Sequence, residues 1–237
     1  MATFVLVHGM WHGGWCWKKV TPLLRAAGHE VYVVTLTGVG ERAHLHYPDI
    51  DMNTHIQDVI GVLEYEDLKQ VILVGHSLSG FMVPAVAERI PERIAHIIIL
   101  DGVLPVDGKS FKDLRPDDWI DFRQRAQANG DEWWMPPTEW TFGVTGDDLI
   151  WLTTKLTPHP LKTWETPLCF TNPAACSIPR TFIHCIEGVS PDDIENQKKD
   201  CVGMGWQYLT LSTEHDAMIL APEELTELLL EFVRVKK

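Results

Sequence analysis

The sequence is poor in basic residues. Its 237 residues include 20 Lys and Arg against 33 Asp and Glu, which gives a formal net charge of −13. A surface of this charge repels phosphate backbones and anionic membrane surfaces. The chain also lacks any uninterrupted apolar run of the roughly 18 residues that a membrane span needs. These absences exclude nucleic acid and membrane as partners and favour a small, neutral substrate.

Cysteine is scarce and unpatterned. The five cysteines are an odd number and show no C-x-x-C spacing, which argues against both a disulfide framework and a zinc site. The first residues lack the basic start and the small-residue cleavage site of a signal peptide, so a cytoplasmic location is expected. We expect no metal and no cofactor, and keep a homodimer as a hypothesis.

Short apolar runs alternate with segments of helical spacing, which is typical of an α/β fold. A chain of this length fits one core, because single cores stop growing at roughly 250–300 residues. Strands are predicted at Phe4–Val7, Val31–Leu36, Val71–Val74, Ile94–Leu100, Thr181–Ile186 and Trp206–Leu211. Helices are predicted at Lys18–Ala27, Asn53–Tyr65, Phe81–Arg89, Pro191–Val202 and Pro222–Val233. This alternation predicts a six-stranded, mostly parallel sheet flanked by helices.

One segment lacks the alternation of predicted strands and helices. Residues 104–177 carry eight prolines and six tryptophans without strand and helix alternation. We interpret them as an inserted helical cap, with residues 1–103 and 178–237 forming the core. Ligands of open parallel sheets bind at the carboxyl ends of the strands, so the functional side chains are expected there.

The strongest motif is Gly75-His76-Ser77-Leu78-Ser79-Gly80, which lies between a predicted strand and a predicted helix. In that context a G-x-S-x-G pattern is a nucleophile elbow, although here Ser79 replaces the second glycine. Ser77 is the predicted nucleophile, and Gly75 and Gly80 allow the close backbone approach that the turn needs. The backbone N–H of Leu78, at the helix start, is the first predicted oxyanion donor.

A glycine-rich turn, His8-Gly9-Met10-Trp11-His12-Gly13-Gly14-Trp15-Cys16-Trp17, follows the first strand. With Leu36–Arg42, Gly75–Gly80 and His215–Met218, this turn resembles the α/β-hydrolase superfamily. The resemblance is closest to the branch of hydroxynitrile lyases, plant methylesterases and bacterial carboxylesterases such as pyrethroid hydrolases. It implies that the backbone N–H of Met10 is the second oxyanion donor. Gly9, Trp11 and His12 are then expected around the substrate pocket, with His12 holding the turn by hydrogen bonds.

The predicted base is His215, the one histidine in the loop after the last predicted strand. The superfamily has the order Ser, acid, His, and two carboxylates satisfy it. Asp101 directly follows Ile94–Leu100, and Glu187 follows the next-to-last strand, where the usual aspartate is missing. We prefer Asp101, and Glu187 remains the alternative acid.

These residues predict a serine esterase that acts on a small, neutral, apolar or aryl carboxylic ester through an acyl-enzyme. The alternatives are a lactone or carbamate hydrolase, a hydroxynitrile lyase and a non-catalytic ligand receptor. The lyases of the resembling branch carry threonine where Gly9 stands and lysine where Asp216 stands. Both differences favour hydrolysis.

Overall fold

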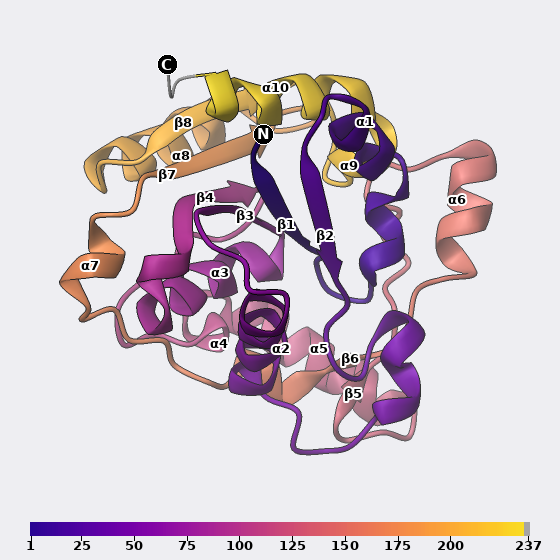
Figure 1. The fold of residues 1–237 in the computed structure, drawn as a ribbon. Coiled ribbons are helices and arrows are strands. Elements are labelled where there is room, and N and C mark those ends of the chain that lie inside the picture. Colours follow the sequence, from indigo (N-terminus) through magenta and orange to yellow (C-terminus); the bar gives the residue numbers. More distant parts are fainter. Residues whose placement is uncertain (235–237) are drawn as a thin grey trace.

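The computed structural model describes residues 1–234, and their centre is a six-stranded sheet (Figure 1). Its strands are β1 (Thr3–Val7), β2 (Glu30–Val34), β3 (Val71–His76), β4 (Ile94–Leu100), β7 (Arg180–Cys185) and β8 (Gln207–Leu211). They lie in the order β2-β1-β3-β4-β7-β8, and every neighbouring pair is parallel. The predicted fold class is confirmed, with all six strands at the predicted places.

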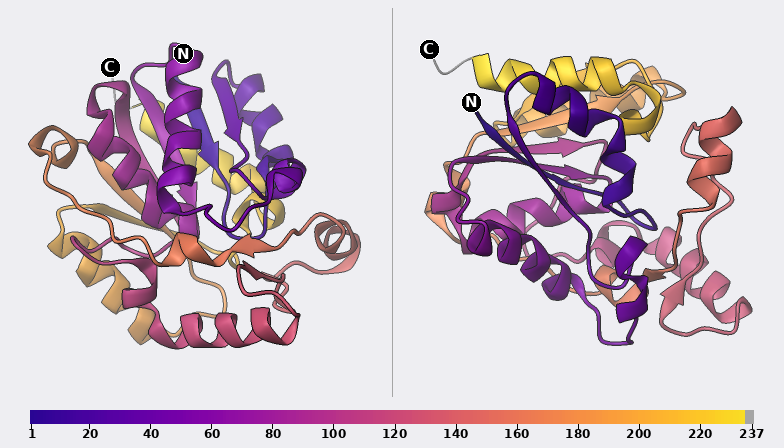
Figure 2. Two further views of the ribbon diagram at one scale, coloured as in Figure 1. Left: turned by 90° about the horizontal axis from the view of Figure 1, so that it is seen from below. Right: turned by 45° about the vertical axis from the view of Figure 1, so that its right-hand side comes forward.

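Helices cover both faces of the sheet. The helices outside residues 104–177 are η1 (Gly14–Lys18), α1 (Val20–Ala26), η2 (Gly40–Leu45), α2 (Met52–Tyr65), α3 (Leu78–Arg89), η3 (Pro91–Arg93), α8 (Pro191–Gly203), α9 (Ala217–Leu220) and α10 (Pro222–Arg234). The pair α1 and α10 packs on one face, and α2 and α3 pack together on the other (Figures 1 and 2). The central strand β3 is therefore buried along its whole length. Each buried aliphatic side chain contributes about 1.5–3 kcal/mol to stability.

Among the predicted boundaries, three at the carboxyl end of the sheet are wrong by two residues or more. The strand predicted to end at Val74 continues to His76. The strand predicted at Val31–Leu36 ends at Val34, because the Leu36 N–H donates to His8 Nε2 and the Thr37 N–H to Asp58 Oδ2. The helix predicted from Phe81 begins at Leu78, directly after the predicted nucleophile.

Most of residues 104–177 lies at the carboxyl ends of the strands, and the end of the segment runs back to the start of β7 (Figures 1 and 2). They contain α4 (Phe111–Leu114), α5 (Pro116–Ala128), β5 (Trp134–Met135), α6 (Gly146–Thr153), β6 (His159–Pro160), η4 (Leu161–Trp164) and α7 (Pro173–Cys176). Besides short helices they hold an antiparallel pair, β5 and β6. The segment is tied to the core where the Thr157 N–H donates to the Trp11 carbonyl and the Asp216 N–H to the Phe142 carbonyl. The division into core and cap stays a prediction.

Among the helices of residues 1–234, none combines the length and the apolar character needed to cross a membrane.

Candidate active site

Ser77 occupies a strained turn between β3 and α3. Its backbone has φ 55° and ψ −122°, a conformation that residues other than glycine rarely adopt. The turn is possible because the flanking backbones pass closely: a Cβ on Gly75 would lie 2.5 Å from the Ser79 carbonyl oxygen. As the first residue of α3, Leu78 has no partner for its N–H inside the helix. The sequence prediction of a nucleophile elbow thus corresponds to a sharp strand–turn–helix.

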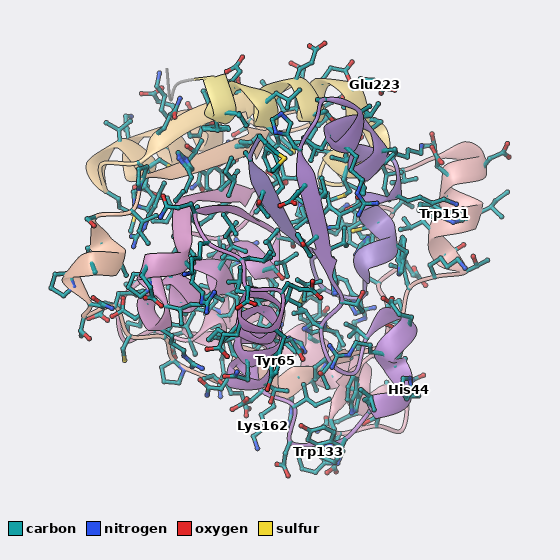
Figure 3. The ribbon with its side chains drawn as sticks, in the orientation of Figure 1. His44, Tyr65, Trp133, Trp151, Lys162 and Glu223 are labelled. Atoms are coloured by element: carbon teal, nitrogen blue, oxygen red, sulfur yellow. The ribbon has the colours of Figure 1, made fainter. Side chains whose placement is uncertain are left out.

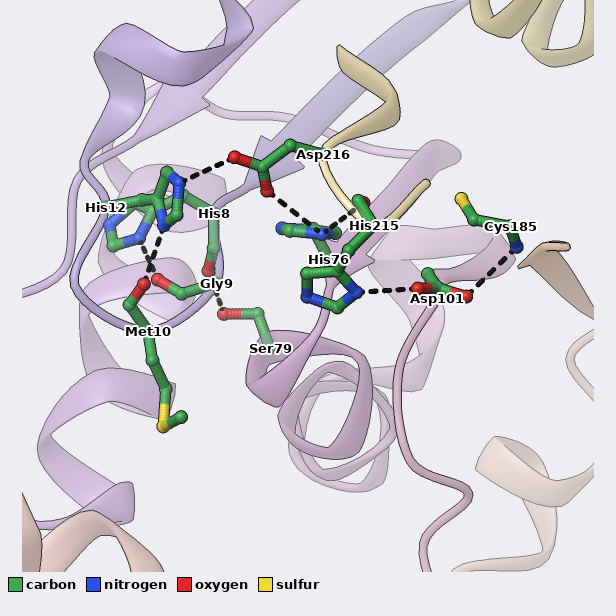
Figure 4. A network of polar contacts seen from close by, with 10 residues as sticks. All are labelled: His8, Gly9, Met10, His12, His76, Ser79, Asp101, Cys185, His215 and Asp216. Atoms are coloured by element: carbon green, nitrogen blue, oxygen red, sulfur yellow. Dashed lines mark hydrogen bonds and ion pairs between the residues drawn. The ribbon is translucent and has the colours of Figure 1, made fainter. Parts of the chain in front are cut away.

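His215 and Asp101 are in direct contact. His215 Nδ1 lies 2.6 Å from Asp101 Oδ2, and the other Asp101 oxygen accepts the Cys185 N–H at 3.0 Å (Figure 4). Asp101 has φ 44° and follows β4 directly, which brings its carboxylate to the loop after β8. Both side chains are largely buried. The carboxylate therefore orients the imidazole and leaves its Nε2 available for proton transfer.

The alternative acid, Glu187, lies in the loop after β7, and its side chain is not the partner of His215. Its backbone N–H donates to the Thr213 carbonyl at 3.0 Å, and its side chain is exposed. Within residues 1–234, the carboxylate that contacts His215 is that of Asp101.

Two histidines hold the turn after β1. His8 Nδ1 donates to the Gly9 carbonyl at 2.8 Å, and His12 Nδ1 donates to the Met10 carbonyl at 2.6 Å. Trp11, at φ 62°, is anchored through its own carbonyl by the Thr157 N–H at 2.9 Å. The predicted role of His12 as the residue that holds the turn agrees with this geometry, whereas the role of His8 was not predicted.

Ser79 has a role that its replacement of the usual glycine did not reveal. Its hydroxyl donates to the His8 carbonyl, which links the first turn of α3 to the end of β1 (Figure 4). The nucleophile turn and the glycine-rich turn are therefore joined at their bases.

Behind these turns lies a buried polar network that was not predicted either. His12 Nε2 lies 3.0 Å from Asp216 Oδ2, and His76 Nε2 donates to the His215 carbonyl at 3.1 Å (Figure 4). Asp216 is fully buried and His12 and His76 are each 1% exposed. Burial and the neighbouring histidines hold the pKa of His76 well below its usual value, so its ring is neutral. In the sequence, Asp216 stands out only as part of the His215-Asp216 pair that carries the family resemblance, and this pair does not reveal the contact with His12.

Atoms of His76, His215 and Asp216 that could coordinate a metal ion lie within 4.8 Å of one another. This is the one candidate metal-binding group in residues 1–234. His215 Nδ1 is bonded to Asp101, His76 Nε2 to a carbonyl and one Asp216 oxygen to His12. The group is thus part of the hydrogen-bond network.

Burial also lowers the pKa of several histidines around the site. It lowers the pKa of His8 to about 3 and those of His55 and His159 below the usual value. His8, His76 and His159, whose pKa values are lowered furthest, bind protons below pH 6.5 in the unfolded chain and much less in the folded chain. Each of these three makes the free energy of unfolding fall by up to about 1.4 kcal/mol per pH unit as the pH drops below 6.5.

Stability is therefore expected to fall by several kcal/mol between pH 7 and pH 5, which urea titration at the two pH values measures. The His159→Gln variant is the control, since its slope should be shallower by about 1.4 kcal/mol per pH unit. Equal free energies of unfolding at pH 7 and pH 5 would contradict this expectation.

A cavity of about 760 Å³ opens above Ser77 and His215. Aromatic side chains make up much of its wall: Trp11, Phe111, Phe122, Trp140, Phe142, Trp164 and Phe182. Gly9, Met10 and His12 also line it, as does Asp101. Among the described residues of this wall, Arg115 is the only Lys or Arg, and its Nε lies 2.9 Å from Asp118. The cavity thus suits a neutral, apolar ligand.

The six tryptophans of residues 104–177 divide into two groups. Trp140 and Trp164 line the cavity, and Trp140 lies over His215 with ring centroids 4.9 Å apart. The others lie away from the cavity: Trp151 packs edge-on against Trp15, and Trp133 is half exposed at the periphery (Figure 3). Most of these side chains therefore serve packing or lie at the surface.

Comparison with known proteins gives consistent matches. The model described as the Alpha/beta hydrolase family matches residues 4–228. A carbendazim hydrolyzing esterase of Nocardioides sp. (strain SG-4G) is 37% identical over 96% of this chain and 98% of its own. Salicylic acid-binding protein 2 of Nicotiana tabacum is 28% identical over 96% and 95%. Among solved structures, an extracellular alpha/beta-hydrolase from a Paenibacillus species superposes with a TM-score of 0.84 at 23% identity, covering 98% of both chains. A pyrethroid hydrolase from Sphingobium faniae JZ-2 gives 0.73 at 22% identity, covering 99% of this chain and 98% of its own.

Proposed function

The chain belongs to the alpha/beta hydrolase family, and from this premise we propose that it is a serine esterase with Ser77 as nucleophile, His215 as base and Asp101 as acid. The observation that carries the proposal is the 2.6 Å contact between His215 Nδ1 and Asp101 Oδ2 beside the strained Ser77 turn. Esterases among the relatives of similar length support the class of reaction.

The mechanism follows from these positions. His215 takes the proton of Ser77 Oγ as that oxygen attacks the ester carbonyl, and Asp101 stabilises the imidazolium that forms. The N–H groups of Met10 and Leu78 stabilise the oxyanion. His215 then protonates the leaving alcohol, and a water molecule activated by the same ring releases the acid. No metal or cofactor takes part in these steps.

The cavity supports a neutral ester with an apolar or aryl group. Its aromatic wall offers edge and face contacts to a ring, and its one arginine is paired with Asp118. A free carboxylate would find no unpaired Lys or Arg among the described residues of this wall. A cytoplasmic location, a homodimer and the cap formed by residues 104–177 belong to the same proposal.

The test is hydrolysis of a panel of p-nitrophenyl and aryl esters by the wild type and by Ser77→Ala. Carbendazim joins the panel, because it stands in the name of the Nocardioides relative. Ser77→Ala is expected to lower kcat by about 10⁴-fold or more, because removal of the nucleophile abolishes acylation. An unchanged rate in this variant would overturn the proposal.

A cyanohydrin in the same panel tests the lyase alternative, and the absence of any turnover would favour a ligand receptor. Gly9 and Asp216 both favour hydrolysis, since the resembling lyases carry threonine and lysine at these positions.

A further inference from the structure

The ion pair of His12 and Asp216 links two loops that are 204 residues apart in the sequence. His12 lies in the turn after β1, and Asp216 directly follows His215. Their side chains are 2% and 0% exposed, and His12 Nε2 lies 3.0 Å from Asp216 Oδ2. A charged pair removed so fully from water costs much desolvation, so its effect on stability alone is small.

Both ring nitrogens of His12 face hydrogen-bond acceptors. Nδ1 lies 2.6 Å from the Met10 carbonyl oxygen, and Nε2 faces the Asp216 carboxylate. A neutral imidazole has one N–H, whereas the imidazolium has two and satisfies both partners. Burial by itself lowers the pKa of His12, but the charge and hydrogen bond of Asp216 and the Met10 carbonyl raise it above the usual value.

The hydrogen bonds of His12 and His8 fix the peptide groups on both sides of Met10. His8 Nε2 accepts the Leu36 N–H at 3.1 Å, so its Nδ1 carries the proton donated to the Gly9 carbonyl. A peptide is planar and trans, so the Met10 N–H points opposite to the Gly9 carbonyl. With the next carbonyl held by His12, neither peptide plane at Met10 can rotate freely.

Asp216, the other member of the pair, acts on the loop after β8 that carries His215, which we call the base loop. The Asp216 N–H donates to the Phe142 carbonyl at 3.3 Å, and the His215 carbonyl accepts from His76 Nε2 at 3.1 Å. Asp216 Oδ1 lies 3.9 Å from the same His76 nitrogen. Because His76 immediately precedes Ser77, the carboxylate is close to both the base loop and the nucleophile turn (Figure 4).

We propose that His12 and Asp216 are positioning residues. They form an ion pair that keeps the oxyanion donor, the Met10 N–H, in a fixed position relative to His215 during acyl transfer. This inference rests on the proposed function. The pair acts through the Met10 backbone on one side and through the loop that carries His215 on the other.

The test compares His12→Ala, Asp216→Ala and Asp216→Asn on one p-nitrophenyl ester, with the inhibition constant of phenylboronic acid as a second readout. Both alanine variants are expected to lower kcat about 10- to 100-fold with less than about a threefold change in KM, because only the oxyanion interaction is loosened. Binding of phenylboronic acid, whose serine adduct is tetrahedral, should weaken by a similar factor. The double alanine variant should be little worse than either single variant.

Asp216→Asn is the rescue variant. A neutral His12 still donates to the Met10 carbonyl and accepts the new amide N–H, so kcat should stay within about threefold of the wild type. The matched control is His55→Gln, which changes an equally buried histidine whose Nε2 contacts the Thr37 carbonyl. Its kcat is expected to be unchanged.

Unchanged kcat in the folded alanine variants, or a loss confined to KM, would overturn the inference. If the alanine variants do not fold, ¹⁵N NMR of the wild-type His12 ring at pH 7 decides: two protonated nitrogens support the pair, and a neutral ring contradicts it. Failure of the proposed function is distinguished from failure of this inference by Ser77→Ala, which would keep its activity only if the proposed function were wrong.

Discussion

Asp101→Asn is expected to lower kcat by about 10³- to 10⁴-fold with little change in KM. The reason lies in the two partners of the carboxylate. The Cys185 N–H at 3.0 Å requires an oxygen, so the new amide would turn its NH₂ group toward His215 Nδ1. His215 would then carry its proton on Nε2 and could not accept the proton of Ser77. Steady-state kinetics on a p-nitrophenyl ester measures the loss.

Glu187→Gln is the matched control for this experiment. The Glu187 side chain is exposed, and its loop is held through its backbone N–H to the Thr213 carbonyl. Its kcat is expected to stay within about twofold of the wild type, because surface substitutions change stability by only about 0.5 kcal/mol and the carboxylate that contacts His215 is that of Asp101. A large loss in Glu187→Gln together with an active Asp101→Asn would assign the acid to Glu187 instead.

Gly9→Ala is expected to lower kcat by about 100-fold or more. A Cβ at this position would lie 2.8 Å from Ser77 Cβ and 3.0 Å from His76 Nδ1. Neither neighbour is a flexible side-chain end, since Ser77 is fixed in its strained turn and His76 is buried. The nucleophile or the oxyanion turn must therefore shift, and a displacement of about 1 Å costs on the order of 100-fold in rate.

Gly61→Ala provides the control for added volume. This glycine lies inside α2, and a Cβ there would meet nothing within 4 Å. It should leave kcat unchanged and stabilise the helix by roughly 0.5–1 kcal/mol. A Gly9→Ala enzyme with wild-type kcat would show that the turn adapts and would contradict the proposed rigid oxyanion site.

The fold could be predicted from sequence because its signals are local. Continuous apolar runs such as Ile94–Leu100 indicate strands buried on both faces, and the glycines around Ser77 indicate a tight turn. The predicted end of β2 was wrong because side chains from distant segments form hydrogen bonds with its backbone groups. His8 ends β2 by accepting the Leu36 N–H, and no pattern within residues 31–36 reveals that partner.

The site could be predicted only in part, for the same reason. Ser77 and His215 each have a local signature, whereas the acid depends on which strand end faces the His215 loop. That depends on strand order, and β4 lies beside β7 in the sheet. The His12–Asp216 pair joins residues 204 positions apart, so one sequence gives no signal that they meet.

The central claim, that Ser77 is the nucleophile of an acyl-transfer reaction, is tested most directly by covalent labelling. The wild type is incubated with a fluorophosphonate, and the intact mass and peptide map are recorded. The proposed mechanism predicts one adduct per chain, located on Ser77, with a parallel loss of ester hydrolysis and no adduct in Ser77→Ala. Full hydrolytic activity in an unlabelled chain, or an adduct on another residue that accompanies inactivation, would contradict it.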